Sequence, residues 1–158
     1  MREVSVTFRT SSPKETIRLG QALGKCLQEG DVVALVGDLG SGKTWFVKGL
    51  ALGLGVGPDQ VVTSPSFSLM NEYEGRCTLF HIDAYRLEAV SDFLDAGLDD
   101  YLHGHGVAVM EWADRWPEVL PERHWKVRIA ILDEHSREIT LFAGHPDAIK
   151  VLKYQLNK

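Results

Sequence analysis

The sequence is poor in cysteine and contains no long hydrophobic run. Its 158 residues include only two cysteines, Cys26 and Cys77, which stand far apart and form no Cys-x-x-Cys pair. This spacing argues against a disulfide framework and against a cysteine-rich zinc site. No apolar stretch approaches the roughly 18 residues that indicate a membrane-spanning helix. The first residues form no apolar signal-peptide region and become polar over residues 9–14. We therefore expect a soluble, cytoplasmic protein with no membrane association.

Positive charge is also scarce. The chain has 17 Lys and Arg against 22 Asp and Glu, a net charge of −5. A free-standing nucleic-acid clamp needs an excess of basic side chains to replace the counterions of the phosphates, so the composition argues against that class. The length fits one domain over residues 1–158, since domains cluster near about 100–150 residues. No internal repeat or linker-like stretch divides the chain.

Hydrophobic periodicity predicts strands that alternate with helices. Ser12, Pro13 and Glu15 form a helix-start pattern in which the serine caps the free amides, and we expect that helix to stop at Gly30. Further helices are predicted over residues 43–54, 87–102 (with breaks at Gly97 and after Leu98) and 145–156. Strands are predicted over residues 4–8, 31–36, 76–82, 107–110, 125–132 and 138–142. This order predicts an α/β sandwich with a mostly parallel central sheet and an antiparallel edge from the late hairpin.

The segment between the second predicted strand and the second helix matches the pattern G-x-x-x-x-G-K-[S/T] at every fixed position. It reads Gly37, Asp38, Leu39, Gly40, Ser41, Gly42, Lys43 and Thr44. Such a loop points its amides at phosphate oxygens, its lysine reaches the β- and γ-phosphates, and its hydroxyl ligates Mg²⁺. A chance match in a glycine-containing turn is expected on the order of once per hundred chains of this length. The position after a buried strand and before a helix favours a P-loop, and with it a P-loop NTPase-type three-layer sandwich.

Two acidic residues follow apolar strands and are candidates for the magnesium site. Asp83 ends the strand predicted over 76–82, and Glu111 ends the strand predicted over 107–110. Strands parallel to the P-loop strand deliver both acids to the edge of the sheet where ligands bind in open α/β folds. The alternative is that either acid caps a turn or pairs with a surface base such as Arg86 or Arg115. Both acids being merely structural is the less favoured outcome.

A hydroxyl-rich loop follows Thr44 by about twenty residues. Thr63, Ser64 and Ser66 could form a switch that the γ-phosphate and Mg²⁺ order. An ordinary proline-containing turn is an equally good interpretation of the residue types. His81 is expected to be a polar core or supporting residue rather than a metal ligand. No Asn-Lys-x-Asp element that reads guanine is present, so GTP has no visible specificity device.

Several separated segments together resemble the TsaE (YjeE) family. They are Gly37 to Thr44, the loop Thr63-Ser64-Pro65-Ser66-Phe67-Ser68-Leu69 with Asn71-Glu72-Tyr73, His81-Ile82-Asp83-Ala84-Tyr85-Arg86-Leu87, and Glu111-Trp112. The resemblance spans roughly residues 12–142. It implies a small bacterial P-loop ATPase that binds ATP/ADP and Mg²⁺ and has slow intrinsic hydrolysis. It also implies a role in threonylcarbamoyladenosine (t6A) modification of tRNA, in which the ATP cycle resets a TsaD–TsaB transferase complex and tRNA is contacted only indirectly.

The resemblance also implies roles for individual residues. Lys43 and the amides of residues 38–44 hold phosphates, Thr44 and Glu111 form the Mg²⁺ pair, and Asp83 organises the metal or the attacking water. Lys43 and Asp83 are thus the expected catalytic residues, and residues 63–66 are the expected switch. Adenine is expected near Ser11 and Ser12 and near the late hairpin, residues 132–134. Trp45 departs from the family, which commonly has a small hydroxyl residue after the P-loop threonine.

Two other functions remain open from the residues. The first is a P-loop small-molecule kinase, with Asp83 as the base and Arg86, Arg115 and Arg123 on a lid, although these arginines are scattered in the sequence. The second is a nucleotide-dependent binding module without meaningful turnover.

Overall fold

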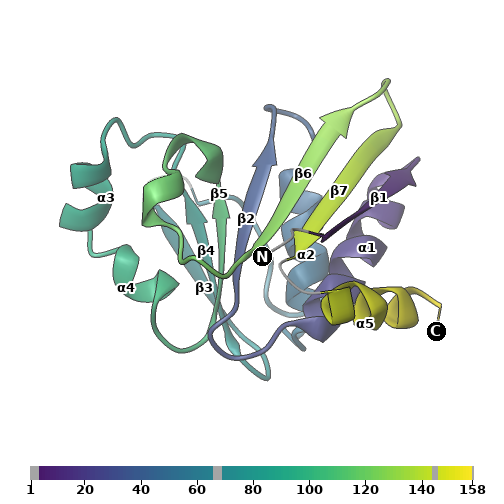
Figure 1. The fold of residues 1–158 in the computed structure, drawn as a ribbon, viewed down its shortest axis with the longest axis horizontal. Helices are drawn as coiled ribbons and strands as arrows, with labels where there is room; N and C mark the ends of the chain where they lie inside the picture. Colours follow the sequence, from purple (N-terminus) through teal and green to yellow (C-terminus); the bar gives the residue numbers. More distant parts are fainter. Residues whose placement is uncertain (1–3, 66–68, 144–145, 158) are drawn as a thin grey trace.

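The protein is built on one sheet of seven strands in the order β1-β7-β6-β2-β5-β4-β3 (Figure 1). A computed structural model describes residues 4–65, 69–143 and 146–157. The strands are β1 (Val4–Thr10), β2 (Val32–Gly37), β3 (Met70–Glu74), β4 (Thr78–Asp83), β5 (Val107–Glu111), β6 (Trp125–Ile131) and β7 (Arg137–Ala143). The central strands β6, β2, β5 and β4 are parallel, whereas β7, β1 and β3 pair antiparallel with their neighbours. The predicted α/β sandwich with a mostly parallel centre and an antiparallel edge is confirmed, and β3 adds an antiparallel strand at the opposite edge.

Helices lie on both faces of this sheet (Figure 1). One face carries α1 (Pro13–Cys26), α2 (Lys43–Gly53) and α5 (Pro146–Leu156). The other face carries the short helices α3 (Val90–Asp95) and α4 (Asp99–Leu102), followed by 3₁₀ turns at Ala113–Arg115 and Pro117–Val119. The result is three layers with one apolar cluster on each side of the sheet. Among the described residues, no helix is long and apolar enough to cross a membrane.

Two helix boundaries differ from the sequence prediction. Helix α1 ends at Cys26 and not at Gly30, because Leu27 already adopts an extended backbone. Gly30 instead lies in the following turn with φ +91°, and its amide donates to the carbonyl of Gly106 at 2.8 Å. In the segment predicted as helical over 87–102, α3 begins at Val90 and not at residue 87. The breaks predicted at Gly97 and after Leu98 are confirmed, because Gly97 has φ +72° and separates α3 from α4, which begins at Asp99.

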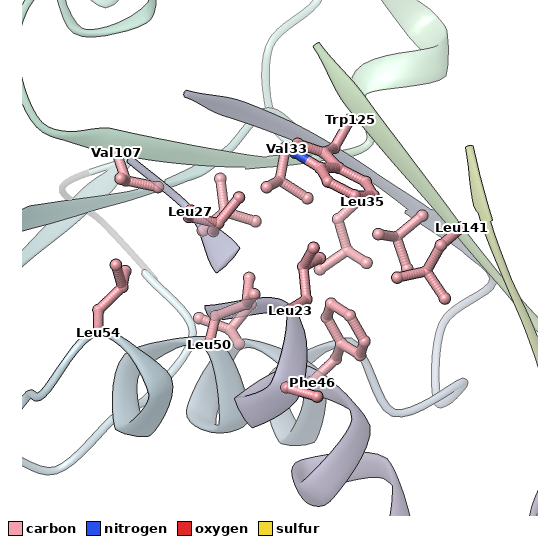
Figure 2. Close-up of a cluster of buried hydrophobic side chains, with 14 of the residues drawn as sticks. Leu23, Leu27, Val33, Leu35, Phe46, Leu50, Leu54, Val107, Trp125 and Leu141 are labelled. Atoms are coloured by element: carbon pink, nitrogen blue, oxygen red, sulfur yellow. The ribbon is translucent and has the colours of Figure 1, made fainter. Parts of the chain in front are cut away.

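The larger apolar cluster lies between the sheet and helices α1 and α2. Figure 2 shows Leu23 and Leu50 on these two helices pointing at the strands, where Val33 and Leu35 of β2 meet them. All four side chains are fully buried. Because α2 begins directly after the glycine-rich loop, this packing fixes the position of the loop relative to the end of β2.

The two helices of this layer touch through glycines. A Cβ at Gly49 of α2 would overlap the carbonyl oxygen of Ile17 and lie 2.9 Å from the Cα of Gly20 in α1. One turn further on, a Cβ at Gly53 would lie 2.8 Å from the Cα of Gly24. Residues four apart lie on the same face of a helix, so both contacts belong to one seam. The seam lets the backbones of α1 and α2 approach more closely than any side chain would allow.

Candidate functional site

The glycine-rich loop connects the carboxyl end of β2 to the first turn of α2. A Cβ at Gly37 would lie only 2.6 Å from Oγ of Ser41 and 3.0 Å from the carbonyl oxygen of Ile129. Gly40 and Gly42 have φ +81° and +103°, a region that residues with a Cβ rarely adopt. Ser41 is fully buried, and its Oγ has no hydrogen-bond partner in the described part of the chain. The loop thus encloses an unsatisfied polar atom next to the N-terminus of a helix, which is a favourable setting for an anion.

Lys43 folds back over this loop. Its Nζ donates hydrogen bonds to the carbonyl oxygens of Gly37 (2.6 Å) and Asp38 (3.1 Å), and it lies 4.2 Å from the ring centroid of Trp112. Burial lowers the pKa of Lys43, although the carboxylates of Glu111 and Asp83 partly oppose this shift. The ammonium group is therefore held by neutral carbonyls and a ring face. A phosphate oxygen would be a stronger partner, because hydrogen bonds between two charged groups are stronger.

The two predicted acids lie side by side at the same edge of the sheet. Asp83 and Glu111 are direct neighbours in the β4–β5 register, and Leu35 of β2 is the neighbour of Glu111 on its other side. Glu111 is 3% exposed and forms a hydrogen-bonded pair with Nε2 of His81, which is fully buried. His81 is therefore a supporting core residue, as the sequence predicted. Arg115, one of the bases considered as a partner for these acids, donates instead to the carbonyl oxygens of Tyr85 (2.7 Å) and Leu87 (3.1 Å).

Asp83 is only half-buried and carries its charge at some cost. Burial raises the pKa of Asp83, and the neighbouring Glu111 raises it further. A hydrogen bond of 3.0 Å from the amide of Tyr85, together with the nearby positive charge of Lys43, opposes that rise. The cost of burying the negative charge of Asp83 is thus only partly offset by its neighbours, and a metal ion or a hydrogen-bonded water would stabilise the carboxylate further.

The predicted switch loop reaches this edge through Ser64. Its Oγ lies 2.7 Å from Oγ1 of Thr44, the last residue of the glycine-rich motif, and Ser64 and Asp83 line the same small cavity. Thr63 is held from the other side, because its carbonyl oxygen accepts from Nδ2 of Asn71 (3.0 Å) and its amide donates to the hydroxyl of Tyr73 (3.2 Å). Ser66, the third predicted switch residue, lies outside the described residues.

Ser12 stands at the same edge but contacts the start of its own helix. The amide of Glu15 donates to its Oγ at 3.2 Å, so the predicted cap of α1 is confirmed. Thr10, two residues earlier, pairs with Arg137 in the β1–β7 register. The register thus brings Ser12 toward the turn between β6 and β7, which includes residues 132–134, the second half of the adenine site that the family resemblance implies.

Two residues of the site carried no decisive signal in the sequence. Trp112 has φ +62°, and its ring lies between Lys43 and Tyr85. The ring centroids of Trp112 and Tyr85 are 5.1 Å apart. Arg137 donates to the carbonyl oxygen of Ser41 at 2.9 Å, across 96 residues of sequence. A Glu-Trp pair after a strand could have indicated the first, but nothing local indicates the second.

These groups fit a nucleotide phosphate with its magnesium ion. In the described residues, no group of three or more His, Cys, Asp or Glu could hold a metal by itself. Mg²⁺ is, however, usually held by one or two carboxylates together with substrate phosphates and water. The hydroxyl of Thr44 and the carboxylates of Asp83 and Glu111 are groups of the kind that would hold Mg²⁺, and the Lys43 ammonium is a group of the kind that would bind a phosphate.

Comparisons with known proteins agree with this geometry. A family model described as "Threonylcarbamoyl adenosine biosynthesis protein TsaE" matches residues 10–139. A Treponema pallidum protein named tRNA threonylcarbamoyladenosine biosynthesis protein TsaE is 46% identical over 130 residues, which cover 82% of this chain and 95% of the relative. A Bacillus subtilis protein of the same name is 42% identical over 137 residues, covering 86% and 84%.

The same relationship is seen in three dimensions. The crystal structure of Bacillus subtilis YdiB superposes with a TM-score of 0.78 at 34% sequence identity, covering 99% of this chain and 97% of that one. The family match spans the glycine-rich loop, the hydroxyl-rich loop and both acids. The chain therefore belongs to the TsaE family of t6A tRNA biosynthesis proteins.

Proposed function

We propose that this protein is a Mg²⁺-dependent ATPase whose nucleotide cycle serves t6A formation on tRNA. The observation that carries the proposal is the juxtaposition of Lys43, folded over a glycine-rich loop, with Glu111 and Asp83 at the ends of the adjacent strands. A lysine on a phosphate-binding loop and acids on neighbouring strands are the parts that P-loop NTPases use.

Each group has a distinct part in this proposal. Lys43 would exchange the carbonyls of Gly37 and Asp38 for phosphate oxygens, to which free amides of the loop would also donate. Thr44 would exchange the hydroxyl of Ser64 for the metal ion, and Glu111, oriented by His81, would complete the magnesium pair. The exchange at Thr44 releases Ser64, which makes the loop of residues 61–65 responsive to the ligand.

Asp83 is the residue that we assign to the attacking water. Its carboxylate is half-exposed, whereas that of Glu111 is buried and already paired with His81. A general base must reach a water molecule, so the more accessible acid is better suited to this role. Magnesium supplies charge neutralisation of the phosphates when bound, and the protein groups hold it and orient the water.

The partner in this proposal is a TsaD–TsaB-like complex in the cytoplasm. The family name connects the chain with threonylcarbamoyladenosine biosynthesis. The net charge of −5 disfavours a direct tRNA clamp, so contact with RNA would be left to the partner. In this role the chain performs no transfer chemistry, and its ATP cycle resets the transferase between turnovers.

Calorimetry with purified protein tests the nucleotide site. We expect heat of binding for ADP and ATP with Mg²⁺, and a loss of affinity of more than about tenfold in Lys43→Ala, because a charged hydrogen-bond partner of the phosphates is removed. Lys48→Ala is the matched control, since Lys48 is an exposed lysine of the same helix whose Nζ lies over Trp45 and not over the loop. Equal affinity of Lys43→Ala and Lys48→Ala would contradict the assigned site.

Hydrolysis and tRNA modification test the roles of the acids and the pathway. Glu111→Gln keeps an acceptor for His81 but removes the charge, so we expect a loss of Mg²⁺-dependent ATP hydrolysis with retained folding. Glu138→Gln, an exposed acid on β7, is the control. In a reconstituted reaction with a TsaD–TsaB pair, multi-turnover t6A formation should require this chain, and full modification in its absence would exclude the proposed role.

The kinase alternative is not favoured by the positions of its arginines. Arg123 precedes β6 and lies beside Asp31 at the amino-terminal edge of the parallel strands, opposite the glycine-rich loop. Arg115 is bound to the carbonyls of Tyr85 and Leu87. These two side chains therefore do not form a lid with Arg86.

A further inference from the structure

Arg137, the first residue of β7, braces the glycine-rich loop from its outer side. Its Nε donates to the carbonyl oxygen of Ser41 at 2.9 Å, and its Nη2 donates to that of Gly40 at 3.4 Å. Its Nη1 donates in the other direction, to the carbonyl oxygens of Asp133 (2.9 Å) and Ser136 (3.0 Å) in the turn between β6 and β7. One guanidinium group therefore joins the loop to a turn that follows it by more than ninety residues.

The carbonyls that Arg137 binds belong to the peptide units of the loop. The oxygen of Ser41 shares its peptide unit with the amide of Gly42, and the oxygen of Gly40 shares its own with the amide of Ser41. A cation that donates to a peptide oxygen polarises the N–H at the other end, because hydrogen bonds in a chain strengthen one another. Gly42 is the N-cap of α2, so its amide also lies at the positive end of that helix.

Two of the four bonds fix the orientation of these peptide units, and the other two anchor the guanidinium group to the turn. Gly40 and Gly42 have positive φ and no side chain, so their own conformational preferences are weak. The planar fork of an arginine can hold several carbonyls at set angles, whereas a lysine offers a single point charge. The turn that supplies the other two carbonyls is itself closed by the amide of Leu132, which donates to Ser136 at 3.1 Å.

We infer that Arg137 is a positioning residue for nucleotide binding, which orients and polarises the amide of Gly42 toward the phosphates without touching the ligand. The amide of Ser41 donates instead to the carbonyl oxygen of Asp38 at 3.0 Å. The inference rests on the proposed function, since it takes the loop to be the phosphate site. It adds the β6–β7 turn to that site as a structural support, because any movement of the turn is transmitted to the loop through one side chain.

Nucleotide binding by Arg137 variants tests this inference. With Mg²⁺ and ADP or ATP in the calorimeter, Arg137→Ala should lower both affinities by about tenfold, the equivalent of one charged hydrogen bond of about 1.4 kcal/mol. Arg137→Lys should be intermediate. Arg128→Ala is the matched control, because Arg128 is an exposed arginine of the same hairpin that lies over the ring of Phe142, 5.5 Å from its centroid. This control should bind within about twofold of the natural protein.

Kinetics and chemical rescue separate positioning from simple stabilisation. Since Arg137 does not contact Lys43, Asp83 or Glu111, Arg137→Ala should raise the KM for ATP and change kcat by less than about twofold. Low concentrations of guanidinium should restore part of the ADP affinity of Arg137→Ala but not that of Lys43→Ala. If Arg137→Ala does not fold, the comparison rests on Arg137→Lys, whose affinity should be at least about threefold weaker than that of the natural protein.

Failures of the two proposals give different results. Absence of ADP binding by the natural protein would refute the proposed function. Binding by the natural protein together with unchanged affinity in Arg137→Ala, or in Arg137→Lys where the alanine variant is unfolded, would refute the role of Arg137 alone. A lower kcat at unchanged KM, or a loss of stability with full affinity, would also overturn it.

Discussion

Replacing Gly49 by alanine should push helices α1 and α2 apart. The added Cβ would overlap the carbonyl oxygen of Ile17 and lie 2.9 Å from the Cα of Gly20 and from the amide nitrogen of Gln21. All three obstacles are main-chain atoms of a regular helix, so no side-chain rotation relieves the overlap. The helices themselves must move, and α2 carries the glycine-rich loop at its N-terminus.

The size of the effect follows from two opposing contributions. Alanine is favoured over glycine inside a helix by about 1 kcal/mol. Overpacking of a tight contact typically costs about 1–3 kcal/mol, and main-chain obstacles place Gly49 at the upper end of that range. The net loss in the free energy of unfolding is therefore about 2 kcal/mol. For a chain of this length that corresponds to a fall in Tm of about 4–8 °C.

Urea unfolding followed by circular dichroism provides the assay, with Gly57→Ala as the control. The nearest atom to a Cβ at Gly57 is the carboxylate oxygen of Asp59, at 2.6 Å, which can rotate away. The control should therefore lose little stability. The double variant Gly20→Ala/Gly49→Ala should lose less than the sum of the two single losses, because the first separation of the helices makes room for the second methyl group. Full stability of Gly49→Ala, or additive losses in the double variant, would refute the seam.

Three further predictions follow from polar groups outside that seam. Burial raises the pKa of Asp83 above 3.8, so the folded state holds its proton to a higher pH than the unfolded state, and the free energy of unfolding falls as pH rises from 3.8 through the raised pKa. Asp83→Asn should therefore flatten this pH dependence and stabilise the ligand-free protein at pH 7 by less than about 1 kcal/mol, and a less stable variant would contradict this. Burial raises the pKa of Cys26 to about 11, so less of the reactive thiolate is present at pH 8 in the folded protein. In a Cys77→Ala background, alkylation of Cys26 should therefore be about twentyfold slower in the folded than in the urea-unfolded protein, and equal rates would contradict the shift. Tyr73→Phe removes the hydroxyl that accepts from the amide of Thr63, so it should lower the free energy of unfolding by about 1 kcal/mol and speed amide exchange at Thr63, whereas unchanged exchange would show that Tyr73 does not hold the loop.

The fold was largely predictable because its parallel strands are buried on both faces. Runs such as residues 32–35 and 107–110 are continuously apolar, a pattern typical of the centre of a parallel sheet. The second antiparallel edge was less predictable. β3 has one buried residue, Tyr73, among five, and its pairing with β4 depends on the sheet and not on its own sequence.

Contacts of the site between residues close in the sequence were easier to predict than contacts between distant residues. The glycine-rich loop is contiguous, and its residues meet because a strand and a helix enclose them. Asp83 and Glu111 could be brought together by a rule, since neighbouring parallel strands end at the same edge. No rule of this kind predicts Arg137. Its side chain reaches the carbonyl oxygen of Ser41, 96 residues earlier, only because the β6–β7 hairpin places residue 137 beside the glycine-rich loop. The left-handed backbone of Trp112 likewise has no local cause, because tryptophan has no preference for that region.

The hydrogen bonds of the site share a feature that connects its stability with its proposed function. Lys43 is held by neutral carbonyls, Thr44 by the hydroxyl of Ser64, and the Oγ of Ser41 has no partner in the described part of the chain. The shifted pKa values of Lys43 and Asp83 show that burial of these charges is incompletely compensated without a ligand. A ligand that binds only the folded state stabilises it by RT ln(1 + [L]/Kd). Phosphate and Mg²⁺ would satisfy the ammonium, the hydroxyls and the carboxylate together. The groups that make the ligand-free site least stable are therefore the ones through which a nucleotide would bind.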